Sequence, residues 1–182
     1  QQLNILTIDV GNTSVKMAVF SNNLCVEFER VVELNVAVLN LWIKQYKIKA
    51  ISYSASGNDK EEIIKFIEHF DQHIFLTHTT AMPIKIAYKT PQTLGKDRIA
   101  AVLGAQSLFP EQHSVVIDMG TCITYEVLNS DGVYLGGNIA PGIKMRLQSM
   151  HDYTARLPLI DVEPITNWIG QSTHEAIKNG AI

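Results

Sequence analysis

The chain has 182 residues, of which 46% are hydrophobic and 18% are charged, a composition typical of a globular protein with a buried core. A net charge of −3 with no basic block argues against nucleic acid as the main partner. The two cysteines have no motif spacing and no apolar run is long enough to cross a bilayer, so we expect no disulfide framework, zinc site or membrane association, and a cytoplasmic location.

The first predicted element is a β-hairpin with polar residues at its turn. An apolar strand at 5–8 leads into Asp9, and a second apolar strand follows at 15–20. Gly11 and Asn12 are expected to form the turn, because both residue types tolerate the positive φ of tight turns. A hairpin needs only the glycine and the asparagine, so Asp9 by itself would be a solvated turn residue.

Alternating strands and helices are predicted after the hairpin. A helix over 34–46 would bury Leu34, Ala37, Val38 and Leu41, whose spacing is helical. Asp59 and Glu62 resemble a capping box at the start of the next helix, whose apolar stripe is Ile63, Phe66, Ile67 and Phe70. The remaining predicted elements are strands at 24–32, 49–54, 73–77 and 84–88 and a helix at 97–109.

The opening pattern then returns as "SVVIDMGTCITYEVL", in which Asp118, Gly120 and Thr121 correspond to Asp9, Gly11 and Asn12. A third strand at 133–139 follows, and Pro141 is expected to open a helix. Two copies of a strand–Asp-x-Gly–strand unit are far more informative than one. The repeat predicts a pseudo-twofold structure in which two glycine turns face each other across a cleft.

Facing glycine turns suit phosphate groups, because their backbone N–H groups can line a concavity without a Cβ in the way. The hydroxyls of Thr13 and Thr121 can add donors. A carboxylate beside phosphates requires a cation, so Asp9 implies Mg²⁺, held through water. Asp118 could serve the same metal or another cation. Neither a Walker P-loop nor a G-x-G-x-x-G motif is present in the sequence.

Several blocks carry a family resemblance: "DVGNTSVK", "YKTPQTLGKDRIAA", "VVIDMGTCIT", "GGNIAPG", "TARLP" and "GQSTHEAI". Together they resemble the acetate/sugar kinase, heat-shock chaperone and actin superfamily, and within it the type III pantothenate kinases, from residue 5 to about 180. The resemblance implies an α/β fold of duplicated ribonuclease H-like (actin-like ATPase) domains, each a mixed sheet flanked by helices, with an interdomain cleft. We place an N-terminal domain with the pantothenate site at 1–112, and a second domain at 113–182.

The same resemblance implies ATP-dependent phosphorylation of pantothenate to 4′-phosphopantothenate, the first step of coenzyme A biosynthesis, by a homodimer. Asp97 would be the general base; from the residues alone it could be an N-cap or first-turn acid. Asp118 would bind a monovalent cation, K⁺ or NH₄⁺. The implied pantothenate-binding residues are Tyr88, Gly95, Lys96, Asp97, Arg98 and Thr173, and the implied ATP-binding residues are Asp9, Val10, Gly11, Asn12, Thr13, Ser14, Val15, Lys16, Gly120 and Thr121.

Some features depart from the family pattern or leave alternatives open. Cys122 stands where alanine is frequent and Glu126 where aspartate is frequent. Thr173 could equally be a capping-box threonine, and Arg98 alone would be a surface arginine. The sequence stops inside an expected helix, so we expect it to be part of a longer chain with an incomplete second domain. A non-catalytic regulatory factor, or another kinase or phosphatase of the superfamily, are the alternative functions.

Overall fold

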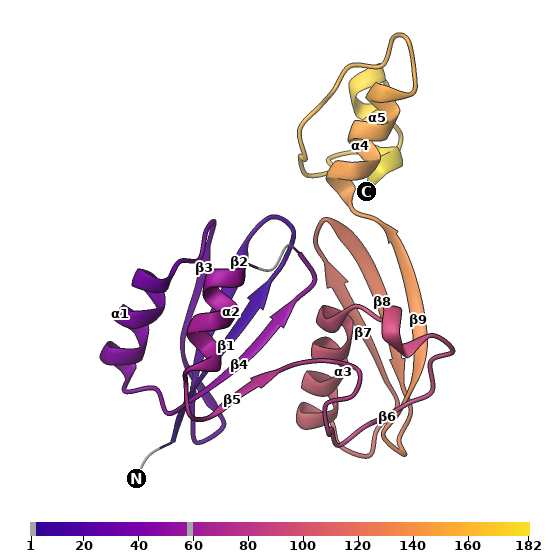
Figure 1. Ribbon diagram of the computed structural model, residues 1–182. Coiled ribbons are helices and arrows are strands. Elements are labelled where there is room, and N and C mark those ends of the chain that lie inside the picture. Colours follow the sequence, from indigo (N-terminus) through magenta and orange to yellow (C-terminus); the bar gives the residue numbers. More distant parts are fainter. Residues whose placement is uncertain (1–2, 58–59) are drawn as a thin grey trace.

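The computed structural model describes residues 3–57 and 60–182 and shows an α/β protein with two mixed β-sheets and five α-helices within those ranges (Figure 1). The two sheets lie beside each other, and a small helical unit stands beyond the end of the second sheet. Within the described part of the chain, no helix is long and apolar enough to cross a membrane. Asp59, half of the predicted capping box, lies outside the described residues.

The first sheet has the order β3-β2-β1-β4-β5. Its first three strands form an antiparallel meander, whereas β4 and β5 run parallel to β1. Strand residues Leu6, Ile8 and Met17 pack with residues of α1 and α2 in one apolar core. The bounds are β1 (Asn4–Val10), β2 (Val15–Ser21), β3 (Leu24–Val31), β4 (Ala50–Ala55), β5 (His73–Phe75), α1 (Val36–Tyr46) and α2 (Glu61–Glu68).

The predicted hairpin is present, but the expected reason for its turn is wrong. β1 and β2 pair up to Val10 and Val15, which leaves a four-residue turn in which the Gly11 N–H donates to the Ser14 carbonyl oxygen at 3.1 Å. Neither Gly11 nor Asn12 has a positive φ. The two adjacent residues with positive φ are Asn22 and Asn23 (φ 49° and 64°), in the tight turn between β2 and β3.

Helix α1 begins after Asn35, whose side chain accepts the Val38 N–H at 3.0 Å. Its buried residues are Leu39 and Trp42. Of the four residues predicted to be buried, Leu34 is buried just before the helix and Val38 packs against the same core. Ala37 and Leu41 are exposed, so the predicted face is only partly correct. The sequence was ambiguous because this helix carries apolar residues on several of its faces. In α2 the predicted stripe is confirmed, since Ile63 and Ile67 are buried and Phe66 and Phe70 pack against the same core.

The second sheet has the order β6-β9-β8-β7. Strands β7 (Ser114–Met119), β8 (Cys122–Leu128) and β9 (Val133–Pro141) form an antiparallel meander like that of β1 to β3, and β6 (Lys85–Ile86) adds a short parallel edge. The repeated sequence pattern therefore corresponds to a repeated strand arrangement. A 3₁₀ turn at Pro91–Thr93 connects β6 to the next helix.

Helix α3 (Lys96–Leu108) joins the two sheets. Its buried Ile99 and Val102 pack with Leu128 and Tyr134 of the second sheet, and the helix also contacts β4 of the first. By sheet membership, the chain passes from the first sheet to the second between β5 and β6, well before residue 112. A division at 112 would place β6 in the N-terminal domain, although β6 pairs with β9 of the second sheet.

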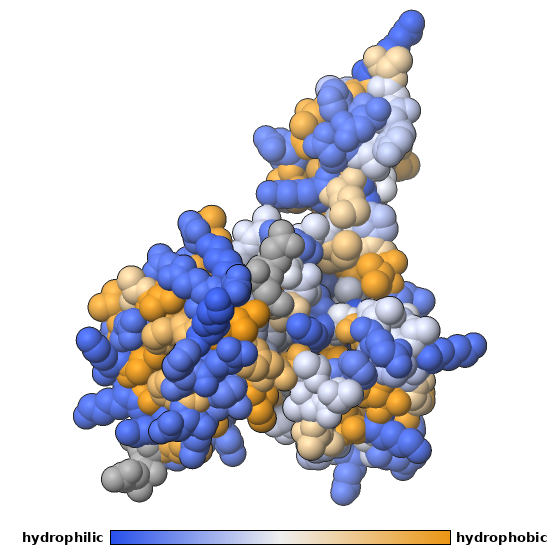
Figure 2. Space-filling view, in the orientation of Figure 1, coloured by the Kyte–Doolittle hydropathy of each residue, from blue (hydrophilic) through white to orange (hydrophobic). Residues whose placement is uncertain are grey.

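The third unit contains α4 (Ile143–Asp152) and α5 (Thr173–Ala181), whose Leu147, Ile177 and Ala181 form a small separate core. Figure 2 shows that it joins the second sheet through a narrow connection. Pro141 ends β9 instead of opening the helix, and Gly142 is the N-cap of α4, because Pro141 still pairs with Cys122 in the sheet.

Candidate active site

The two glycine turns, which the repeat predicted to face each other across a cleft, are in direct contact. The turn after β1 carries Thr13 and the turn after β7 carries Thr121, and their hydroxyl oxygens lie 2.9 Å apart in a hydrogen bond. In each turn the glycine N–H is engaged locally, Gly11 with the Ser14 carbonyl and Gly120 with the Cys122 carbonyl. Both hydroxyls are on exposed residues, so the contact lies where a ligand could reach it.

Two further carboxylates influence Asp9 at this junction. Burial is the main cause that raises the pKa of Asp9, the negative charges of Asp97 and Asp118 raise it further, and the nearby Lys16 ammonium lowers it. The Lys16 Nζ lies 3.6 Å from Asp9 Oδ2. Three acidic residues from the ends of β1 and β7 and the start of α3 therefore share one electrostatic environment.

One oxygen of Asp9 has no partner. Oδ1 is buried and accepts no hydrogen bond from the described residues, and the same holds for the hydroxyl of Ser54, which is 6% exposed. Asp9 and Ser54 are paired across the parallel strands β1 and β4, so both side chains belong to the same face of the sheet. Buried polar atoms without partners are rare, and here they fit a hydrated cation or water.

Asp97 lies in the first turn of α3, and the preceding Gly95 has no side chain to crowd its carboxylate. Gly95 is the N-cap, so Asp97 is a first-turn acid and not the cap itself. Asp97 Oδ1 accepts the backbone N–H of Arg98 at 3.0 Å. A Cβ on residue 95 would lie 2.5 Å from that same oxygen, so only glycine allows the carboxylate to fold back here. Lys96 is half-buried beside it.

Arg98 is not the surface residue that the sequence alone suggested, and its guanidinium is already paired with a carboxylate. It is 6% exposed, and its Nε and Nη2 donate to the two oxygens of Glu126 at 2.6 and 2.8 Å. This pairing raises the pKa of the guanidinium above its usual value. Tyr134 donates its hydroxyl to the same Glu126 carboxylate at 2.5 Å. The Arg98 guanidinium also lies 5.6 Å from the centre of the Tyr88 ring.

Sequence reasoning missed Glu126, Tyr134 and Ser54 as parts of the site. Glu126 and Tyr134 are fully buried, and Glu126 shares a strand face with the buried Leu128. An acidic residue on a strand face that is otherwise buried needs a cationic partner, and that pattern could have identified Glu126. Nothing in the sequence distinguishes Ser54 from its neighbours.

Thr173 lies elsewhere. It is the exposed first residue of α5, in the unit that Figure 1 shows apart from α3. The alternative of a capping threonine is wrong, because the N-cap is Ser172, whose hydroxyl accepts the Glu175 N–H at 3.2 Å. The Glu175 carboxylate in turn accepts the Gln171 N–H at 2.7 Å.

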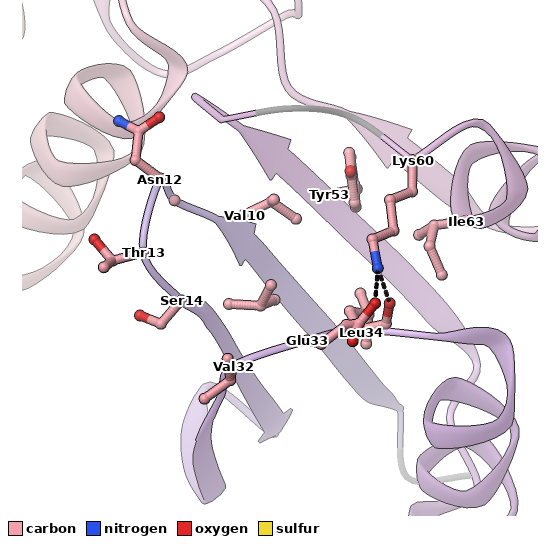
Figure 3. A pocket seen from close by; sticks show the side chains of 12 residues that line it. Val10, Asn12, Thr13, Ser14, Val32, Glu33, Leu34, Tyr53, Lys60 and Ile63 are labelled. Atoms are coloured by element: carbon pink, nitrogen blue, oxygen red, sulfur yellow. Dashed lines mark hydrogen bonds and ion pairs between the residues drawn. The ribbon is translucent and has the colours of Figure 1, made fainter.

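A pocket of about 210 Å³ lies along the first glycine turn (Figure 3). Its lining includes Tyr53 and Lys60, and the Lys60 ammonium is held by Glu33 and by the Leu34 carbonyl oxygen. Asp9, Asp97 and Asp118 do not line this pocket. The first glycine turn therefore has the pocket on one side and the three carboxylates on another. The lining residues from the turn and its flanks are Val10, Gly11, Asn12, Thr13, Ser14 and Val15.

His69 and His73 lie four residues apart in the sequence, at the end of α2 and the start of β5. His69 and His73 are exposed, and each ring Nδ1 lies within hydrogen-bond distance of a backbone carbonyl oxygen, that of Lys65 and that of Phe70. Across residues 3–57 and 60–182, no three His, Cys, Asp or Glu side chains are grouped as metal ligands.

Solved structures show the same kind of fold. The chain superposes on a Campylobacter jejuni protein described as a Baf family transcriptional activator with a TM-score of 0.58 and 23% identity, over 96% of this chain and 72% of that one. For an Aquifex aeolicus Ppx/GppA family member the TM-score is 0.50 with 15% identity, over 88% and 57% of the two chains. Both likenesses concern the fold alone, a mixed α/β fold.

Sequence relatives are closer. The family model of the type III pantothenate kinases matches residues 5–182. A type III pantothenate kinase from Flavobacterium johnsoniae is 39% identical over 98% of this chain and 74% of its own length. One from Christiangramia forsetii is 41% identical over 97% of this chain and 74% of its own length. The chain belongs to the type III pantothenate kinase family.

Proposed function

We propose that this protein transfers the γ-phosphoryl group of ATP to the primary hydroxyl of pantothenate, which forms 4′-phosphopantothenate for coenzyme A biosynthesis. The observation that carries the proposal is the meeting of two glycine turns beside Asp9, Asp97 and Asp118 in a member of this family. Phosphoryl transfer needs little covalent chemistry from the protein, so positioning and charge neutralisation are the main tasks of such a site.

The glycine turns are suited to the phosphates of ATP. The hydroxyls of Thr13 and Thr121 now bond to each other, so each can donate to a phosphate oxygen once that bond opens. Lys16, 3.6 Å from Asp9, would add positive charge beside the phosphates. The remaining proposed ATP contacts are Val10, Gly11, Asn12, Ser14, Val15 and Gly120.

Asp9 fits the role of holding Mg²⁺ through water. Its Oδ1 is buried without a hydrogen-bond partner among residues 3–57 and 60–182, and the same is true of the Ser54 hydroxyl on the neighbouring strand, so both can bond to water. When bound, Mg²⁺ would neutralise charge on the phosphate oxygens. Asp118, at the end of β7, is proposed to bind the monovalent cation, K⁺ or NH₄⁺.

Asp97 is the proposed general base. Its Oδ1 accepts the Arg98 N–H, and its other oxygen can take the proton of the pantothenate hydroxyl as that oxygen attacks. Gly95, Lys96 and Arg98 adjoin Asp97 in sequence, and the Tyr88 ring lies against the Arg98 guanidinium, which supports a pantothenate site at the start of α3. Thr173 remains a proposed contact from the separate helical unit.

The architecture proposed for this chemistry is a pair of duplicated domains with the substrates in the cleft between them. The repeated meanders β1–β3 and β7–β9 and the contact between their glycine turns support it. The boundary at residue 112 stays a prediction, and the sheet membership of β6 favours an earlier one. The homodimer remains a prediction from the family resemblance, and the cytoplasmic location remains a prediction from the sequence.

Ligand-induced stabilisation tests the substrates. Mg-ATP should raise the melting temperature of the protein, and pantothenate should raise it further, because a ligand that binds only the folded state stabilises it. Glucose and acetate serve as controls and should give no second shift. Stabilisation by a sugar instead of pantothenate would favour another kinase of the superfamily, and no response to either would favour a non-catalytic regulator.

A further inference from the structure

The buried ionic network behind α3 has no assigned part in the proposed phosphoryl transfer. It consists of Arg98, Glu126 and Tyr134, of which Glu126 and Tyr134 are fully buried and Arg98 is 6% exposed. Each Glu126 oxygen is bonded, Oε1 to Arg98 Nε, and Oε2 to both Arg98 Nη2 and the Tyr134 hydroxyl. A buried carboxylate with three donors is a rigid anchor, because any movement leaves a charge without a partner.

The network continues to the surface of the proposed pantothenate site. The Tyr134 ring is stacked with the Tyr88 ring, with 6.2 Å between centroids and 13° between planes. The Arg98 guanidinium lies over the Tyr88 ring, 5.6 Å from its centroid. Gly136, at φ +113°, brings its backbone so close that a Cβ there would lie 3.5 Å from Tyr88.

Arg98 also fixes the direction of Asp97. The two are consecutive residues in the first turn of α3, so their side chains point about 100° apart around the helix axis. Arg98 is anchored to β8 of the second sheet, whereas Asp97 lies near enough to Asp9 for its charge to raise the pKa of that residue. Two donors of Arg98 are already committed to Glu126, so Nη1 carries most of the donors left for a substrate.

We infer that Glu126 and Tyr134 are positioning residues of the kinase: through the bidentate pair with Arg98 they orient the Asp97 carboxylate and the Tyr88 ring toward pantothenate. This inference rests on the proposed function. It predicts that disturbing the network lowers kcat and raises the KM for pantothenate, while the KM for ATP stays nearly unchanged. A purely structural network would lower stability and change neither half selectively.

The test compares Glu126→Gln, Tyr134→Phe and Glu126→Asp in the full chain, assayed well below their melting temperatures. Glu126→Gln keeps the shape and removes the charge, and we expect kcat to fall by about 10- to 100-fold, as small displacements of a reacting group can cost that much. The KM for pantothenate should rise, and the KM for ATP should stay within about twofold. Tyr134→Phe should show the same pattern more weakly.

Glu126→Asp is the conservative variant, because it restores the charge on a side chain one methylene shorter. We expect its kcat to lie clearly above that of Glu126→Gln. Leu128→Ala is the matched control: this fully buried residue lies on the same strand and in the same apolar core as Tyr134, but outside the ionic network. It should lower the melting temperature and leave kcat and both KM values close to wild type.

Amide hydrogen exchange of residues 95–100 gives a readout that needs no activity. Glu126→Gln should accelerate exchange there more than Leu128→Ala does, relative to each variant's loss of global stability. Wild-type kinetic constants and unchanged relative exchange in Glu126→Gln would overturn the inference. An inactive wild type with faster exchange in Glu126→Gln would instead uphold the anchoring of α3 and refute the proposed function.

Discussion

Asp9 combines a structural cost with a proposed functional role. Its carboxylate is partly buried, faces the charges of Asp97 and Asp118, and has only Lys16 as an ionic partner among the described residues. No local sequence pattern could have revealed this, because Asp97 and Asp118 are distant in the sequence. The sequence predicted that Asp9 binds a cation, whereas the buried, unpartnered oxygen could only be found in the structure. Such strain is expected at sites that bind charged ligands.

Asp9→Asn should therefore stabilise the protein without ligand. The raised pKa means that Asp9 binds a proton more readily in the folded state, so stability falls as pH rises from the ordinary value of 3.8 through the folded pKa. Removing the charge should increase the free energy of unfolding by on the order of 1 kcal/mol at about pH 7.5. Denaturant unfolding at about pH 4 and about pH 7.5 should show a larger advantage of the variant at the higher pH.

The same variant should lose most of the stabilisation that Mg-ATP gives to the wild type. A destabilised Asp9→Asn protein at neutral pH, or an advantage that shrinks as pH rises, would contradict the assignment of Asp9 as a strained residue.

Among the elements, the first glycine turn owes its shape to a loop far from it in the sequence. The N–H groups of Ser56 and Gly57 donate to the Val10 carbonyl oxygen, and Gly57 lies directly on Gly11. Strands β1 and β2 could be predicted from alternating apolar residues, but this contact could not, since it depends on how β4 ends beside β1. The misplaced face of α1 has a similar origin, because tertiary packing decides between neighbouring apolar stripes.

Gly57→Ala should disturb the turn, because the new Cβ would lie 2.7 Å from the Gly11 carbonyl oxygen. We expect a loss of about 1–3 kcal/mol in the free energy of unfolding, as for other overpacked sites. Mg-ATP should also stabilise the variant less than the wild type, which thermal shift can measure.

Gly104→Ala is the control for a glycine that nothing crowds. It lies inside α3 with open space where a Cβ would be added, so alanine should stabilise the helix by about 0.5–1 kcal/mol. Equal stability and equal Mg-ATP response for Gly57→Ala and the wild type would show that the loop does not set the turn.

At the scale of the whole molecule, the repeat Asp9-x-Gly11 and Asp118-x-Gly120 predicted the most important feature, the meeting of two halves at their turns. The Thr13–Thr121 hydrogen bond confirms that contact. The sequence could not assign β6 to the second sheet, because a two-residue edge strand has almost no pattern of its own. It also could not show the separate α4–α5 unit, where a small core forms between segments that are distant in the chain.

Potassium dependence tests whether both halves serve the site. The second half contributes Asp118, which is proposed to bind a monovalent cation. Phosphoryl transfer should be faster in potassium or ammonium than in sodium at equal ionic strength, and Asp118→Asn should reduce that difference. The KM for ATP measured in each salt separates the cation effect from general screening. Equal rates in sodium and potassium would remove the cation site from the account.

The most direct test of the central claim is ADP release from Mg-ATP in potassium buffer, measured with and without pantothenate, for the wild type and Asp97→Asn. We predict release that depends on pantothenate and falls by about 10²- to 10⁴-fold in the variant, which should still fold and bind Mg-ATP. Pantothenate-dependent release at the wild-type rate from Asp97→Asn would remove Asp97 as the base. Absence of pantothenate-dependent release from folded wild-type protein would contradict the assignment as a pantothenate kinase.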